Sequence, residues 1–234
     1  EIGSGLVGSE MCIRDRYFPA TTKADVAKDR ARITVTDEEG DVTELNLQLN
    51  SDGYVEFCNS IDHAGTPDAD EFTWEMEYDT EGHLVVMKRS ESDGEITNIT
   101  YKDGDVVKTS TRYVASGDLN GDGIIDSNDE WEYSAAIDYT TDNITAPIEN
   151  KGCLMLFDEI LDVDMDEMIY AYYGGMLGKA TKHLPLVGHY TYNGEDSVSD
   201  MYFTWTLNSD SYPTELVVKD QWDEYRCCLL YTSP

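Results

Sequence analysis

The chain has 234 residues, of which 48 are acidic and 16 are basic, so its formal net charge is −32. A surface this negative repels phosphate backbones and anionic lipid headgroups, which argues against nucleic-acid binding and against docking on an anionic membrane surface. No run approaches the roughly 20 apolar residues of a transmembrane helix. The 16 tyrosines, 4 tryptophans and 5 phenylalanines argue against a disordered acidic chain.

The two ends of the chain are related to each other as nucleic-acid sequences. One set of codons for the closing CLLYTSP, read as its reverse complement, encodes SEMCIRD, which is Ser9–Asp15. A sequencing-library adapter of the transposon type, translated at both ends of an assembled read, gives this relation. We therefore expect residues 1–16 and 228–234 to be adapter-derived, and residues 17–227 to form a single antiparallel β domain that is a fragment of a longer protein.

Apolar residues alternate with polar ones through the first half of this domain. The stretch RITVTDEEGDVTELNLQLNSDGYVEFCN places apolar side chains at every second position between turns at DEEGD and NSDG, and FTWEMEYDTEGHLVVMKRSESDGEITNITYKDGDVVK repeats the design. Short alternating runs that are separated by Asp-Gly and Glu-Gly turns are typical of antiparallel hairpins. The sequence predicts a mainly β fold, an antiparallel meander of repeated hairpins.

Two cysteines lie securely inside the predicted domain, Cys58 and Cys153, while Cys227 lies close to the adapter-derived end. Two cysteines far apart in sequence fit a disulfide, a metal pair or two buried thiols. We expect buried free thiols, because unpaired cysteine behaves as a small apolar residue.

The stretch GDLNGDGIIDSNDEW, Gly117–Trp131, has the spacing of a calcium-binding EF-hand loop. Such loops supply oxygen atoms from positions 1, 3, 5, 7, 9 and 12 and place glycine at position 6 for a sharp turn, here Gly123. The acid at position 12 has Glu130 beside it as an alternative ligand. The predicted calcium ligands are Asp118, Asn120, Asp122, Ile124 through its backbone carbonyl, Asp126 and Asp129.

This loop resembles the calcium loops of dockerin modules, which also open with D-x-N-x-D-G and often carry aspartate at position 12. Dockerins have two such loops that lead into helices, whereas here one loop is followed by EWEYSAAIDYT, whose alternation predicts a strand. We therefore expect the loop to lie at the tip of a β-hairpin, where calcium would stabilise the fold without moving helices. The alternative is a loop that uses these residues for turn geometry alone.

One segment departs from the period of two. In DVDMDEMIYAYYGGMLGKATKHLP, apolar residues recur at three- and four-residue spacing from Met165 to Leu177, acidic residues precede them, and Pro185 follows. This pattern predicts an amphipathic helix over residues 164–183 that packs against the sheet.

Three parts of the chain together resemble a known family: the hairpins YDTEGHL and ITNITYKDGDVVK, the segment NKGCLMLFDEILDVDMDEMIYAYYGGMLGKATKHLP, and the closing YTYNGED and YFTWTLNSDSYPTELVV. The family consists of exported lipoproteins of unknown function from gut Gram-negative anaerobes and is described as having a porin-like fold. The resemblance implies a curved sheet, a half-barrel, with one packed helix. It also implies export to the periplasm or cell surface, with a lipid anchor upstream of this fragment.

From the resemblance and the loop we expect a non-enzymatic, monomeric envelope lipoprotein, a binding or structural β module with one stabilising Ca²⁺ site. Its partner would be a glycan or another envelope protein. The alternative is an enzyme that acts on polysaccharide, or a glycan-binding protein, with the concave face of the sheet as its cleft. A concave face filled by the helix would count against this alternative, and an aromatic and carboxylate cluster there would support it.

Overall fold

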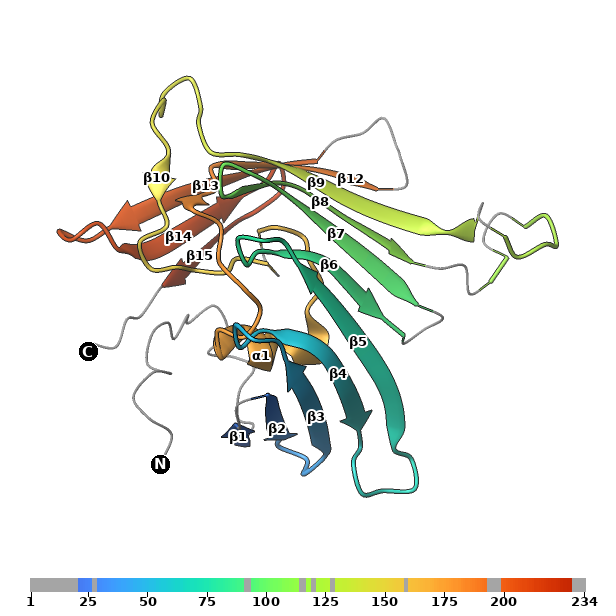
Figure 1. The fold of residues 1–234 in the computed structure, drawn as a ribbon. Helices are drawn as coiled ribbons and strands as arrows, with labels where there is room; N and C mark the ends of the chain where they lie inside the picture. The colour runs from blue at the N-terminus through green and yellow to red at the C-terminus, as the bar shows by residue number, and fades with distance from the viewer. Residues whose placement is uncertain are drawn as a thin grey trace.

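The computed structural model describes residues 21–26, 29–90, 94–113, 117–118, 121–126, 129–157, 160–192 and 199–228. Within these residues thirteen strands form one antiparallel sheet, in which each strand pairs with its neighbour along the chain from β1 to β9 and from β12 to β15. β9 and β12 also pair with each other. Figure 1 shows the sheet bending into an open, strongly curved shell. The predicted antiparallel meander is confirmed.

The elements have the following bounds. The strands are β1 (Thr21–Val26), β2 (Arg30–Thr36), β3 (Val42–Leu49), β4 (Val55–Asp62), β5 (Asp70–Tyr78), β6 (Leu84–Arg89), β7 (Glu95–Lys102), β8 (Asp105–Tyr113), β9 (Trp131–Asp138), β10 (Ile148–Glu149), β11 (His183–Leu184), β12 (Val187–Tyr192), β13 (Ser199–Leu207), β14 (Pro213–Lys219) and β15 (Glu224–Cys228). The helical elements are η3 (Asp166–Met168) and α1 (Ile169–Tyr173). β10 and β11 form a separate two-stranded sheet.

The alternation seen in the sequence determines which face of the sheet is buried. In β3, Leu45 and Leu47 are buried while Asn46 between them is exposed, and in β5 Trp74 is buried beside the exposed Glu75. Because successive side chains of a strand point to opposite faces, one face of the whole sheet is apolar. This apolar face is the concave one.

The concave face is covered by one stretch of the chain, residues 150–157 and 160–186, which we call the inner segment. It lies inside the curve of the sheet together with α1 (Figure 1). It supplies much of the hydrophobic core, and its most deeply buried side chains are Leu154, Phe157, Ile160, Leu161, Val163, Met165, Met168, Leu177 and Leu184. The core therefore lies between the sheet and a segment of the same chain.

The helix predicted over residues 164–183 is much shorter in the structure. Within residues 164–183 only η3 and α1 are helical, and α1 ends in a Schellman motif, in which the Met176 N–H bonds to the Ala171 carbonyl and the Gly175 N–H bonds to the Tyr172 carbonyl. Gly175 has a φ of 69°, which glycine adopts without strain. No helix among the described ranges has the length and apolar character needed to cross a membrane.

After α1, backbone groups of the inner segment bond to the turns of the sheet instead of continuing a helix. The Met176 carbonyl accepts the Val55 N–H, and the Lys179 and Lys182 N–H groups donate to the carbonyls of Gly82 and Gly104. The predicted apolar stripe is nevertheless mostly buried, including Met165 and Leu177. The three- and four-residue spacing of apolar residues therefore identified the buried residues correctly, but the helix that it predicted over residues 164–183 is wrong for most of its length.

The cysteines inside the domain do not pair with each other. Cys58 is free and buried, and Cys153 is free and exposed. Burial and the nearby negative charge of Glu167 raise the pKa of the Cys58 thiol to about 12. The expectation of free thiols is confirmed, but the expectation that both are buried is wrong for Cys153.

Candidate functional site

The predicted calcium loop joins β8 to β9, which pair with each other as a hairpin. The carboxylate of Asp118 accepts the backbone N–H groups of Gly121, Asp122 and Gly123 at 2.7–3.0 Å. Asp122 in turn accepts the N–H of Ile124 at 2.8 Å. The loop is therefore wound around the aspartate at position 1. The loop is flanked by the strands β8 and β9. Dockerin modules have helices at these positions and use them to bind their partner, so a dockerin-type contact does not fit this loop.

The far side of the loop is closed by its last acid. Asp129 is buried, with 1% of its surface exposed, and its carboxylate accepts the N–H of Asp126 at 3.0 Å. Glu130 points elsewhere, since its carboxylate pairs with Arg112 of β8 at 2.9 Å. Of the two acids considered for position 12, Asp129 is the one that belongs to the loop.

The structure describes five of the six predicted ligands. Asn120 lies outside the described residues, and the backbone of Ile124 is described while its side chain is exposed. Among the residues that the structure describes, no three histidine, cysteine, aspartate or glutamate side chains are grouped as ligands of one metal ion. Within the described part of the loop, the carboxylates of Asp118, Asp122 and Asp129 accept backbone N–H groups of the loop itself.

Hydrogen bonds fix the inner segment to the concave face. The Thr109 hydroxyl donates to the Leu161 carbonyl and the Tyr190 hydroxyl donates to the Ile160 carbonyl, both at 2.6 Å between buried groups. Buried polar groups that are paired in this way stabilise one arrangement of the chain. The middle of the concave face is therefore core, and the cleft that the polysaccharide alternative needs is occupied there.

Two adjacent acids of the inner segment are also held by the sheet. Arg89 of β6 pairs with Asp166 and Glu167, and the indole N–H of Trp74 donates to Glu167. Burial nevertheless raises the pKa of Glu167 to about 7, because desolvation outweighs the attraction of the nearby Arg89. We interpret these acids as anchors of the inner segment.

One end of the concave face carries aromatic side chains that the sequence reading did not single out as a site. Tyr113 lies opposite Trp131, and Tyr133 lies opposite Tyr192, in the register of β8, β9 and β12. The Tyr133 ring meets those of Tyr192 and Tyr113 edge to face, with centroids 5.0 and 5.7 Å apart. Trp131 and Tyr192 are about two-fifths exposed. We call these four residues the concave aromatic cluster.

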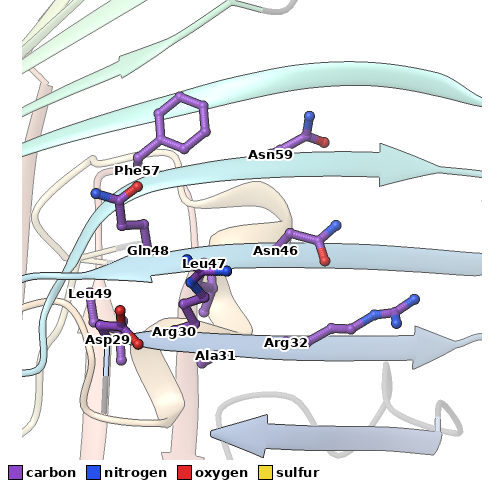
Figure 2. Close-up of a pocket in the computed structure, with 10 residues that line it drawn as sticks. All are labelled: Asp29, Arg30, Ala31, Arg32, Asn46, Leu47, Gln48, Leu49, Phe57 and Asn59. Atoms are coloured by element: carbon purple, nitrogen blue, oxygen red, sulfur yellow. The ribbon is translucent and has the colours of Figure 1, made fainter. Parts of the chain in front are cut away.

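A second surface feature lies on the opposite, convex face of β2, β3 and β4. It is a groove of about 660 Å³, shown in Figure 2, which we call the outer groove. Its walls carry two arginines, three carboxamides and one aromatic ring, from Arg30, Arg32, Asn46, Gln48, Asn59 and Phe57. Alternation in each strand predicts that these polar residues point outward, but only the strand register shows that they are neighbours.

A third cavity, of about 710 Å³, lies where the inner segment meets the turns after β5 and β7. Much of its lining is backbone, because glycines such as Gly104, Gly174 and Gly178 form its wall beside Tyr173 and Lys182. Gly178 has a φ of 83° and sits so close to Gly82 that a Cβ atom would lie 2.7 Å from the Gly82 carbonyl oxygen. This cavity marks the contact between the inner segment and the sheet.

Comparison with known proteins identifies the fold. The family model for a domain of unknown function with a porin-like fold (DUF4595) matches residues 12–215. A porin-like protein from Bacteroides uniformis superposes with a TM-score of 0.59 at 22% identity, covering 91% of this chain and 76% of its own. A porin-like protein from Bacteroides vulgatus superposes with a TM-score of 0.62 at 16% identity, covering 90% and 85%. No curated protein matches the chain.

Proposed function

We propose that this chain, which belongs to the family of domains of unknown function with a porin-like fold, is a non-enzymatic module of the cell envelope that acts through its outer surfaces. The observation that carries this proposal is the filled concave face. The carbonyls of Ile160 and Leu161 are bonded to side chains of the sheet, and Phe157 and Leu161 are completely buried there. Neither a pore nor a central catalytic cleft fits an interior that is packed by the same chain.

The location at the envelope is part of the proposal. The porin-like proteins of similar fold come from Bacteroides, and the family resemblance in the sequence implies export with a lipid anchor upstream. A net charge of −32 keeps such a module in solution above an anionic membrane surface. A partner at the envelope would be a glycan or another protein.

We also propose that the loop Asp118–Asp129 binds one calcium ion, which stabilises the hairpin of β8 and β9. Carboxylates and backbone carbonyls are the hard oxygen donors that calcium prefers. The carboxylate of Asp118 accepts three N–H groups, and a carboxylate has lone pairs for about four partners. Calcium would neutralise part of the repulsion among the acids of this loop, so it should favour the folded state.

The test is thermal unfolding with and without calcium. Extracellular calcium modules have Kd values of about 10⁻⁴–10⁻³ M, so about 5 mM calcium adds roughly 1–2 kcal/mol of stability. For a domain of this size the melting temperature should rise by about 2–4 °C per kcal/mol. Asp118→Ala combined with Asp122→Ala should abolish the rise.

The matched control removes two exposed aspartates outside the loop, Asp68→Ala with Asp70→Ala, and should keep the calcium response. Sodium chloride of equal ionic strength separates specific binding from general screening. If several millimolar calcium does not change the melting temperature of the wild-type protein, the calcium proposal is overturned. The proposal that the concave face is filled by the inner segment would still stand.

A second candidate function is glycan binding on the concave face, favoured by the concave aromatic cluster. Exposed tryptophan and tyrosine rings offer flat apolar surfaces on which sugar rings stack, with polar edges for hydrogen bonds. Trp131 at 41% exposure and Tyr192 at 42% are the accessible members. Loss of saccharide binding in Trp131→Ala would support this candidate, and unchanged binding would remove it.

A further inference from the structure

The outer groove is built from two cross-strand rows on the convex face. In the first row Arg32 of β2 lies opposite Asn46 of β3, and Asn46 lies opposite Asn59 of β4, in the strand register. In the second row Arg30 pairs with Gln48 and Gln48 pairs with Phe57. Neighbouring strands lie about 4.8 Å apart and alternate residues about 7 Å apart. The groove therefore presents a regular grid of planar polar side chains with one aromatic ring, as Figure 2 shows.

The carboxamides of this grid have hydrogen-bonding capacity that the protein does not use. Among the described residues, the buried side-chain oxygen of Asn59 has no hydrogen-bond partner, and the Asn46 side chain is exposed. Gln48 donates to Glu56 and keeps its carbonyl oxygen as an acceptor. Each carboxamide both donates and accepts hydrogen bonds. Hydroxyl groups also donate and accept hydrogen bonds, so they are suitable partners for these carboxamides.

The charges at the groove leave no positive excess. Arg30, Arg32 and Asp29 line it, and Glu44 and Glu56 contact the lining side chains of Arg32 and Gln48, so two positive and three negative groups lie there. The chain as a whole carries −32, and this field opposes the approach of anions. A neutral ligand is not repelled by this negative field.

We propose that the outer groove binds a neutral saccharide. The carboxamide of Asn46 and the amide N–H of Asn59 hydrogen-bond to its hydroxyl groups, and the ring of Phe57 packs against the apolar face of one sugar ring. This gives the envelope module a ligand class and places the glycan on the convex face, whereas the second candidate function places it on the concave face. The site does not include the calcium loop, so the two proposals succeed or fail separately.

Isothermal titration of the intact chain with neutral hexasaccharides of glucose, xylose, mannose and galactose tests the proposal. At least one should bind, and Asn46→Ala combined with Asn59→Ala should weaken its affinity by about tenfold or more, since two hydrogen bonds are lost. Asn46 is exposed, so Asn46→Ala alone leaves the fold intact and should weaken binding in the same direction. Phe57→Ala should also weaken binding.

The matched control is Asn98→Ala, which removes an exposed asparagine from β7, away from the groove. It should bind like the wild type, as should Trp131→Ala. The proposal is overturned if no neutral hexasaccharide binds, or if binding is lost in Trp131→Ala and kept in the groove variants. Binding of an oligogalacturonate in preference to every neutral sugar would also overturn it. Chelation of calcium should leave the affinity unchanged at a temperature where the protein stays folded.

Discussion

At the scale of single residues, Glu167 is a buried carboxylic acid whose pKa lies near neutrality. Its side chain is 10% exposed, and burial raises its pKa to about 7 although Arg89 and Trp74 both bond to it. A raised pKa in the folded state means that the folded protein holds this proton more tightly than the unfolded chain. The associated stability is present below pH 4.5 and is lost as the pH rises towards 7.

We therefore predict that Glu167→Gln flattens the pH dependence of unfolding. The amide oxygen of glutamine still accepts the Trp74 N–H, and the proton-linked loss, on the order of 1–3 kcal/mol between about pH 4.5 and 7, disappears. Urea unfolding at several pH values measures it. Glu71→Gln, at an exposed position of β5, is the control. An unchanged slope in Glu167→Gln would show that this carboxyl does not titrate in that range.

At the scale of elements, the structure depends on how the inner segment docks on the turns of the sheet. Lys179 donates to the Gly82 carbonyl at 2.8 Å, and Tyr78 packs beside Gly178 at that contact. The Tyr78 hydroxyl donates to the Val55 carbonyl at 2.8 Å, which fixes the same region of β4 and β5. Close backbone approach of this kind requires residues without a side chain.

We predict that Gly178→Ala destabilises the protein more than Gly53→Ala. Both glycines have a positive φ, 83° and 85°, so both substitutions introduce backbone strain of about 1–2 kcal/mol. Only at Gly178 would the new Cβ lie 2.7 Å from a carbonyl oxygen, whereas Gly53 has open space. We expect a difference of at least about 1 kcal/mol, since the Lys179 bond must shift. Equal losses in urea unfolding would mean that the docking contact adjusts freely.

At the scale of the whole molecule, two properties combine: a shell filled by its own chain and a large excess of negative charge. The chain has 48 acidic and 16 basic residues, and charged side chains are mostly at the surface of a folded protein. Ion pairs such as Lys88 with Glu77 are exposed and contribute little. With a net charge of −32, we therefore expect repulsion among the remaining carboxylates to dominate the electrostatic part of the folding free energy.

We predict that sodium chloride stabilises this protein. Raising the ionic strength shortens the Debye length from about 10 Å at 0.1 M to about 3 Å at 1 M, which screens the repulsion over most of the surface. The melting temperature should increase by several degrees over that range in calcium-free buffer. A melting temperature that falls with salt would indicate that attractive pairs outweigh repulsion.

The sequence by itself determined the strands from β2 to β9, the face of each that is buried, and the loop with an aspartate at its first position. These follow from local rules: a period of two places Leu45 and Leu47 on one face, and Asp-Gly turns reverse the chain. Only the tertiary structure decided the rest. The helix ends at Tyr173, after which backbone groups of the inner segment bond to the turns of the sheet, and the spacing of apolar residues does not reveal such partners. The outer groove likewise exists because strand register brings Arg32, Asn46 and Asn59 together from three strands.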